Sequence, residues 1–310
     1  MKASALARAF AQVWQQEDIN FLLTNRVPRI ALTRFMGWVS QIRSARLARW
    51  SIWIWRRFTE LDLSDAAGTR FDSLQACFTR ALKPGSRTID PDPGVLVSPS
   101  DGIVGACGEV RDGQSFQAKG MPYALTDLFA GDALAQAYRD GLYVTLRLTS
   151  GMYHRFHAPC AARVRQVTYI SGDTWNVNPI ALARVQRLFC RNERALIPLQ
   201  LPGGALVTLV PVAAVLVASI RLHFLDVLLH LKYRGPHRLA CDTRVDRGQE
   251  LGWFQHGSTI LVFAPRGFAL APGIAPGRHV RMGERLLLCP GADEDTALSR
   301  AEVTIPAHAA

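Results

Sequence analysis

The sequence predicts an α+β protein in which N-terminal amphipathic helices precede a β-rich core of short, mostly antiparallel strands. Three observations predict it. Between residues 28 and 58, apolar side chains recur at helical spacing with arginines between them. From about residue 94, short β-branched runs alternate with Gly, Pro, Asn and Asp. Apolar residues make up 49% of the 310-residue chain, which indicates a globular protein with a real core.

Residues 1–60 are expected to form a helical, membrane-associating region. They contain ten Lys or Arg residues and three acidic ones, so most of the chain's +11 charge lies here. Tryptophan and arginine interleaved on amphipathic helices are typical of helices that lie in a bilayer interface. The alternative is a helical hairpin that packs on the core with its arginines in water. Nucleic acid is not an expected partner, because no binding module accompanies the charge.

Residues 61–290 are expected to form the β-rich core. In the first part of this core, residues 71–80 are predicted to form a short helix, and its end is expected near Lys83-Pro84-Gly85. The apolar stretch at 205–220 is too short to span a membrane and is predicted to form buried strands. Residues 291–310 are predicted to be a flexible tail.

The cysteines do not form a metal or disulfide pattern. None of the six are spaced as C-x-x-C, and no histidines stand at zinc-site spacing from them. They are expected to be buried, reduced thiols in a cytosolic protein, and no metal is expected. No signal peptide is recognisable at the N-terminus.

Gly257 and Ser258 stand between two strand-like segments. Glycine permits a tight bend there, and Ser258 places its hydroxyl near the carbonyl of its own preceding peptide bond. Taken alone, the pair is a plain turn. It could also let a serine attack its own backbone.

Other polar features accompany the strands. Asp101, in Ser-Pro-Ser-Asp-Gly at 98–102, is by itself a turn residue. His154 and His157, three residues apart in an extended segment, would face opposite sides, so that one could serve a site and the other support it. Both could equally be structural. A loop rich in turn formers covers residues 171–179.

An acid, a histidine and a serine in this order permit a relay in which the acid orients the imidazole and the imidazole activates the hydroxyl. Chain order alone does not establish it. The serine-hydrolase elbow G-x-S-x-G is absent, because Ile260 stands where its last glycine would be. A conventional acyl hydrolase is therefore not favoured.

Taken together, the motifs resemble the phosphatidylserine decarboxylase family from about residue 20 to about residue 288. Each motif is weak alone, and their ordered coincidence is specific. They are Phe-Thr-Arg-Ala-Leu-Lys-Pro-Gly at 78–85, Ser-Pro-Ser-Asp-Gly at 98–102, Lys-Gly at 119–120 with Tyr-Ala-Leu at 123–125, Tyr-His-Arg-Phe-His at 153–157, Val-Asn-Pro at 177–179, Asn-Glu-Arg at 192–194 and Gly-Ser-Thr at 257–259.

The resemblance implies a proenzyme that cuts itself between Gly257 and Ser258. The products would be a β chain of residues 1–257 and an α chain of residues 258–310. Ser258 would become a pyruvoyl group, which serves as the cofactor. The resemblance matches Asp101 to the relay acid, His157 to the base and Ser258 to the nucleophile.

The implied activity is conversion of phosphatidylserine to phosphatidylethanolamine and CO2 through a Schiff base to the pyruvoyl group. His154 or His157 would reprotonate the product carbon, and the sequence does not choose between them. The expected location is the cytoplasmic face of the cell membrane, as a peripheral protein on an anionic surface. The β and α chains of one proenzyme would stay associated, and homodimer formation is left open.

Two other functions stay open. One is a non-catalytic, membrane-associated β-rich scaffold. The other is a related pyruvoyl decarboxylase that acts on a different amino substrate. The sequence also departs from the family pattern at His256, where a small or branched apolar residue is usual, and at Asn176, where Ser is common. Neither position belongs to the relay.

Overall fold

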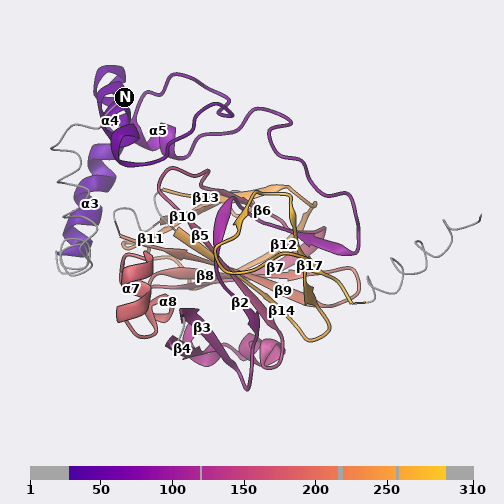
Figure 1. Cartoon of the computed structure of the whole chain (residues 1–310). Helices are drawn as coiled ribbons and strands as arrows, with labels where there is room; N and C mark the ends of the chain where they lie inside the picture. The colour runs from indigo at the N-terminus through magenta and orange to yellow at the C-terminus, as the bar shows by residue number, and fades with distance from the viewer. Residues whose placement is uncertain (1–27, 119–120, 216–218, 256–257, 291–310) are drawn as a thin grey trace, which may run out of the picture.

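A computed structural model describes residues 28–118, 121–215, 219–255 and 258–290. Figure 1 shows a β-rich body with helices α3, α4 and α5 gathered at one end. The predicted fold class is confirmed. The first 27 residues of the expected helical region, the expected tail at 291–310, Lys119-Gly120 and His256 lie outside the described residues.

An eight-stranded antiparallel sheet forms the centre of the molecule. Its strands, in spatial order, are β12 (Arg238–Val245), β7 (Ala162–Ile170), β8 (Arg194–Gln200), β9 (Leu206–Ala213), β14 (Ser258–Ala264), β5 (Leu142–Leu148), β2 (Gly102–Glu109) and β16 (His279–Val280).

Three smaller antiparallel sheets accompany the central one. They are a four-stranded sheet of β11 (Val227–His230), β10 (Ser219–Leu222), β13 (Glu250–Phe254) and β6 (Arg155–His157), a three-stranded sheet of β1 (Val95–Val97), β17 (Arg285–Leu288) and β15 (Ala269–Leu270), and the pair β3 (Gln114–Ala118) and β4 (Met121–Ala124). The apolar stretch at 205–220 contributes buried residues of β9 and β10, as predicted.

Strand β14 lies inside the central sheet and is covered on both faces, so all seven of its residues are buried. Ile260 and Val262 pack into the core that also holds β6, β10 and β13. Leu261 and Phe263 pack into a second core on the opposite face. Burial on both faces explains why residues 259–264 read as a nearly continuous apolar run.

Short helices cover the second face. They are α6 (Leu125–Leu128), the 3-10 helix η1 (Ala133–Tyr138), α7 (Pro179–Arg184) and α8 (Leu188–Arg191). The Val-Asn-Pro motif starts α7, because Asn178 caps the helix through Ala181 N at 2.8 Å and Pro179 occupies its first turn.

The N-terminal helices are α3 (Arg29–Ser40), α4 (Ala45–Phe58) and α5 (Leu74–Phe78). Ser44 caps α4 and Ser73 caps α5. The helix predicted within residues 71–80 is shorter than expected, because the Ser73 cap fixes its start and Thr79 ends it. Within the described residues, no helix has both the length and the hydropathy needed to cross a membrane.

Candidate active site

Ser258 is the first residue of β14, where it pairs with Leu148 of β5 and Ala213 of β9. The preceding strand β13 belongs to the four-stranded sheet. β13 and β14 therefore belong to different sheets and are not the paired strands of a hairpin, which a plain turn at Gly257-Ser258 would predict. Gly257, on the other side of the expected cut, lies outside the described residues.

The Ser258 hydroxyl is buried, and Oγ has no hydrogen-bond partner among the described residues. A buried hydroxyl without a partner costs free energy, so it calls for an explanation, such as a chemical role or a bound water.

His157 lies at the end of β6, where its backbone N–H donates to Pro99 O at 2.7 Å. Its Nδ1 lies 2.9 Å from Gly248 O. A carbonyl only accepts, so Nδ1 carries the proton and Nε2 has the free lone pair. Tyr153 O–H then donates to Nε2 across 2.9 Å. Burial lowers the pKa of His157, which keeps the imidazole neutral and able to act as a base near pH 7.

Asp101 is buried just before β2 and is held by two partners. Arg87 binds its carboxylate through two nitrogens, with Nε 2.9 Å from Oδ1, and Met282 N donates to Oδ1 at 2.9 Å. Both His157 ring nitrogens have other partners, so the structure does not join Asp101 and His157 by a direct hydrogen bond. The carboxylate instead bonds to Arg87, whose guanidinium carbon lies 6.0 Å from the Tyr153 ring centre.

His154 is fully buried and has a different environment. Its Nδ1 lies 2.8 Å from Met152 O, and its ring centre is 3.9 Å from that of Phe78, which stacks on Trp55 of α4. Phe254 N donates to His154 O at 3.0 Å. His154 therefore lies opposite the end of β13 that leads to residue 258, whereas His157 pairs with Glu250 at the other end.

The Asn-Glu-Arg motif supports the wall beside Ser258. Asn192 Nδ2 donates to Ala213 O at 2.9 Å, and Ala213 N donates to Glu193 O at 2.8 Å. Arg194 donates to four backbone carbonyls. Burial raises the pKa of Glu193 to about 7. The motif thus fixes the strand that flanks the serine.

Sequence reasoning missed Arg87 and the role of Tyr153 as the partner of His157. Tyr153 stands inside a recognised motif, so its position was a usable signal. No motif singles out Arg87, because its partners Asp65 and Asp101 lie 22 and 14 residues away in the sequence, respectively.

A cavity of about 590 Å³ opens at the end of the central sheet where β14 begins. Leu148 and Ala213 flank Ser258, and the chain beyond each of them, at 149–150 and 214–215, lines this cavity. Its other described lining residues are mostly apolar and include Met36 of α3, Trp55 and Phe58 of α4, and Val177. A molecule in this cavity would approach the N-terminal end of residue 258 with apolar groups around it.

Comparison with known proteins gives one consistent result. The family model described as "Phosphatidylserine decarboxylase" matches residues 74–288. A phosphatidylserine decarboxylase proenzyme from Dickeya dadantii is 33% identical over 290 residues, covering 90% of this chain and 94% of that protein. One from Methylibium petroleiphilum is 37% identical over 290 residues, covering 88% and 99%. One from Marinobacter nauticus is 33% identical over 285 residues, covering 86% and 96%.

Proposed function

The chain belongs to the phosphatidylserine decarboxylase family, and we propose that it is a proenzyme that cuts itself between Gly257 and Ser258 and then converts phosphatidylserine to phosphatidylethanolamine and CO2. The observation that carries this proposal is Ser258: a buried hydroxyl with no hydrogen-bond partner in the described part of the chain, at the start of a central strand and beside a largely apolar cavity.

Self-cleavage requires a base and a nucleophile. His157 is assigned as the base from its match to the family motif, since in the structure it lies opposite the far end of β13 from residue 258. In the cleavage step, its Nε2, released by Tyr153, takes the hydroxyl proton of Ser258, and Oγ attacks the Gly257 carbonyl. The amide becomes an ester, and the C–N bond to residue 258 breaks. Loss of the Ser258 α-proton then breaks the Cβ–O bond, leaving a carboxylate on Gly257 and dehydroalanine at 258. Water converts that group to a ketone and releases ammonia. Asp101 acts through Arg87 and Tyr153 in positioning this histidine.

The residues around Ser258 fit the pyruvoyl group that would result. When formed, this group supplies a ketone that condenses with the substrate amine and withdraws electrons from the carbon that loses CO2. His154 is the candidate that protonates this carbon, because it lies opposite the end of β13 nearest to residue 258. Its contact with Phe78, which stacks on Trp55, links it to helix α4 over the cavity.

The fold supports continued association of the two chains after the cut. Residues from 258 onward supply β14, β15, β16 and β17. β14 pairs with β5 and β9, β16 with β2, and β17 with β1. These backbone pairings and the core around β14 do not require the Gly257–Ser258 bond.

We further propose that α3 and α4 rest on a membrane with an anionic surface. Large exposed apolar side chains in the described residues are concentrated on these helices; they are Ile30, Phe35, Trp38, Leu47, Trp50, Trp53 and Phe58, with Phe116 the exception elsewhere. Aromatic side chains and arginines together suit the interface of a bilayer with negative charge.

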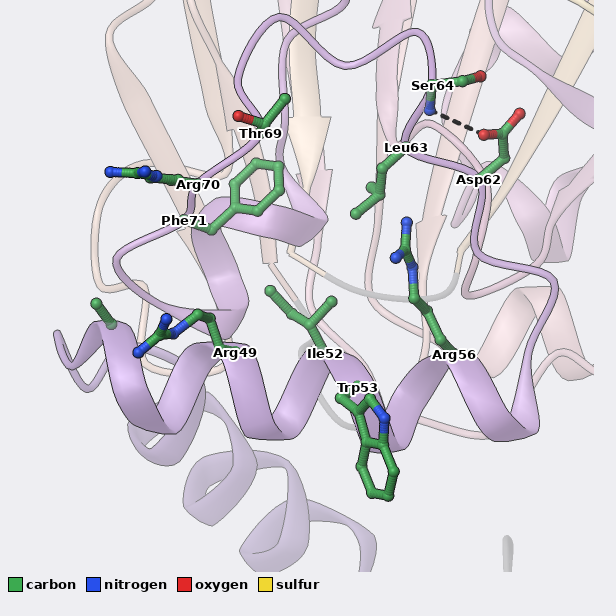
Figure 2. Close-up of a pocket in the computed structure, with 11 residues that line it drawn as sticks. Arg49, Ile52, Trp53, Arg56, Asp62, Leu63, Ser64, Thr69, Arg70 and Phe71 are labelled. Carbon is green, nitrogen blue, oxygen red and sulfur yellow. Dashed lines mark hydrogen bonds between the residues drawn. The ribbon is translucent and has the colours of Figure 1, made fainter.

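Figure 2 shows how α4 divides its side chains. Ile52 and Arg56 point towards residues 62–71 across a cleft of about 880 Å³, whereas the Trp53 ring, which also borders this cleft, is directed to the opposite side of the helix. Arg57 lies 4.3 Å from the Trp53 ring centre, so cation and aromatic ring share the outer side of the helix. This outer side is the one we place against lipid.

A trapping experiment tests the activity. The purified protein is mixed with phosphatidylserine and then reduced with cyanoborohydride, and the fragments are weighed. The proposal expects release of CO2 and a lipid adduct on the smaller fragment only. A cut protein that releases no CO2 from phosphatidylserine but does so from another amine-bearing substrate in a panel would overturn the substrate assignment.

A further inference from the structure

Arg147 is an arginine of β5 that lines the cavity beside Ser258. It is half-buried, and among the described residues no hydrogen bond or ion pair reaches its guanidinium. Burial lowers its pKa, and no carboxylate in the described part of the chain opposes this effect. A cation removed from water without a counter-charge is costly, so the site favours an anion.

Two buried hydroxyls near Arg147 also have no hydrogen-bond partner among the described residues. Thr259 pairs directly with Arg147 across the ladder, and Thr145 is two residues earlier on the same face. Both threonines are buried, and neither hydroxyl has a hydrogen-bond partner within the described chain. Buried polar groups without partners call for an absent water or ligand.

The cavity as a whole is matched to an anionic amphiphile. Of its described lining residues, Arg147 is the sole charged one, and there is no carboxylate among them. Met36, Trp55, Phe58, Leu74 and Val215 give it an apolar lining that continues to the exposed aromatic side of α4. An aliphatic chain with one negative group near the sheet would meet both requirements.

The register places Arg147 close to the reacting residue. Ser258 pairs with Leu148, the next residue of β5, so the Cα atoms of Arg147 and Ser258 are about 6 Å apart, while their side chains point to opposite faces of the sheet. In phosphatidylserine four bonds separate the amine nitrogen from phosphorus, a span of roughly 5 Å. Because residue 258 is the first residue of β14 and Arg147 lines the cavity at that end of the sheet, a substrate whose amine is at residue 258 can extend past the end of the strand and bring its phosphate within reach of this long side chain.

Two anionic groups of the substrate compete for the assignment. The carboxylate leaves as neutral CO2, so a cation bound to it would stabilise the starting state over the transition state and slow the reaction. The phosphodiester keeps its charge throughout. A cation bound to the phosphodiester strengthens binding without opposing the chemistry.

We infer that Arg147 binds the phosphodiester of the lipid substrate and thereby positions its amine at residue 258. The inference rests on the proposed function for the identity of the lipid. It makes Arg147 a positioning residue that contributes to KM more than to kcat.

The test uses Arg147→Met, Arg147→Lys and the matched control Arg266→Met, an exposed arginine on the loop after β14. The substrate is dihexanoyl phosphatidylserine, which is monomeric in water, so membrane binding does not enter. Loss of a charged hydrogen bond predicts that Arg147→Met raises KM by about 10- to 100-fold and leaves kcat within about threefold. Arg147→Lys should recover part of the loss, and Arg266→Met should match the parent. Complete self-cleavage of each variant serves as the folding check.

A second arm separates the two anionic groups. Dihexanoyl phosphatidylethanolamine has the phosphodiester but lacks the carboxylate. Arg147→Met should weaken its inhibition constant by the same factor as KM. If KM rises and this constant does not, Arg147 binds the carboxylate and the inference is wrong. If Arg147→Met changes neither KM nor the inhibition constant, the inference is also wrong.

A third arm is independent of turnover. Calorimetric binding of dihexanoyl phosphatidylethanolamine to the parent and to Arg147→Met reports the site directly. If the parent binds it in an Arg147-dependent manner but does not decarboxylate phosphatidylserine, the proposed function fails and the subsite stands. If the parent decarboxylates and binding is the same in both proteins, the function stands and the subsite fails.

Discussion

Strand β14 and helix α4 are both rich in apolar side chains, but those of β14 are buried in the protein and many of those of α4 are exposed at its surface. Every residue of β14 is buried within the protein. Of the fourteen residues of α4, Ala48 alone is buried, and Trp50, Trp53 and Phe58 are more than half exposed. The apolar character of β14 holds a serine in place, whereas that of α4 is left for contact with something outside the chain. Chemistry should therefore depend on the sheet, and recruitment to lipid on the helix.

The largest effect is expected from the two histidines of the sheet region. His157→Ala should slow self-cleavage by about 10²- to 10⁴-fold, because it removes the proposed base. His154→Ala should still be cut, and should lose a similar factor in CO2 release instead. Pulse-chase gels of newly made chain measure the first rate, and lipid assays measure the second. Equal loss of cleavage in both variants would contradict the division of roles.

The next contrast concerns stability, measured in the uncut Ser258→Ala background so that one chain unfolds. Phe263 is fully buried against Phe129, Tyr138 and Tyr143. Phe263→Ala should lower the free energy of unfolding by about 3–5 kcal/mol. The matched change Phe35→Ala, at a ring that is 56% exposed on α3, should cost less than about 1 kcal/mol. Similar costs in urea titrations would show that α3 is packed rather than free.

The helix side of the comparison is tested by Trp50→Ala together with Trp53→Ala. Binding to vesicles that contain phosphatidylglycerol should fall by about 10- to 100-fold, because two large apolar surfaces no longer enter the interface. Self-cleavage should be unchanged. Phe116→Ala, an exposed ring on β3, is the control and should bind as the parent does. If the control weakens binding and the double variant does not, the membrane face has been misplaced.

The smallest effect is the pH dependence of self-cleavage. Burial lowers the pKa of His157 from its ordinary value near 6.5, so the neutral base persists to lower pH than a free imidazole would. The rate should change by less than about threefold between pH 7.5 and 6.5, and should fall about tenfold per unit below the lowered pKa. Cleavage of proenzyme made in a cell-free system at several pH values measures this. A steady fall that begins near pH 7 would exclude the buried state of His157 as the reacting one.

The order of elements was accessible from the sequence because helical and strand periodicities are local. The pairing of strands was not. The sequence on either side of residue 257 predicts two strands joined by a turn. In the structure, β13 pairs with β6 and β10 in one sheet, and β14 pairs with β5 and β9 in another. Such pairing depends on contacts far apart in the chain.

The candidate site shows the same limit. Ser258, His157 and Asp101 could be proposed from motifs, but the partners of each side chain could not. Asp101 was expected beside His157, and the structure gives it Arg87 instead. Arg147 lies in no recognised motif, and its position in the cavity follows from the register of β5 with β14.

The most direct test of the central claim is the intact mass of the purified protein beside its Ser258→Ala variant. The parent should give two fragments, residues 1–257 and residues 258–310 with a ketone in place of the serine amine, that co-purify until denatured. The variant should give one chain of full mass with the same circular dichroism. A parent that remains one full-length chain, or a variant that is cut at the same bond, would contradict the assignment of Ser258.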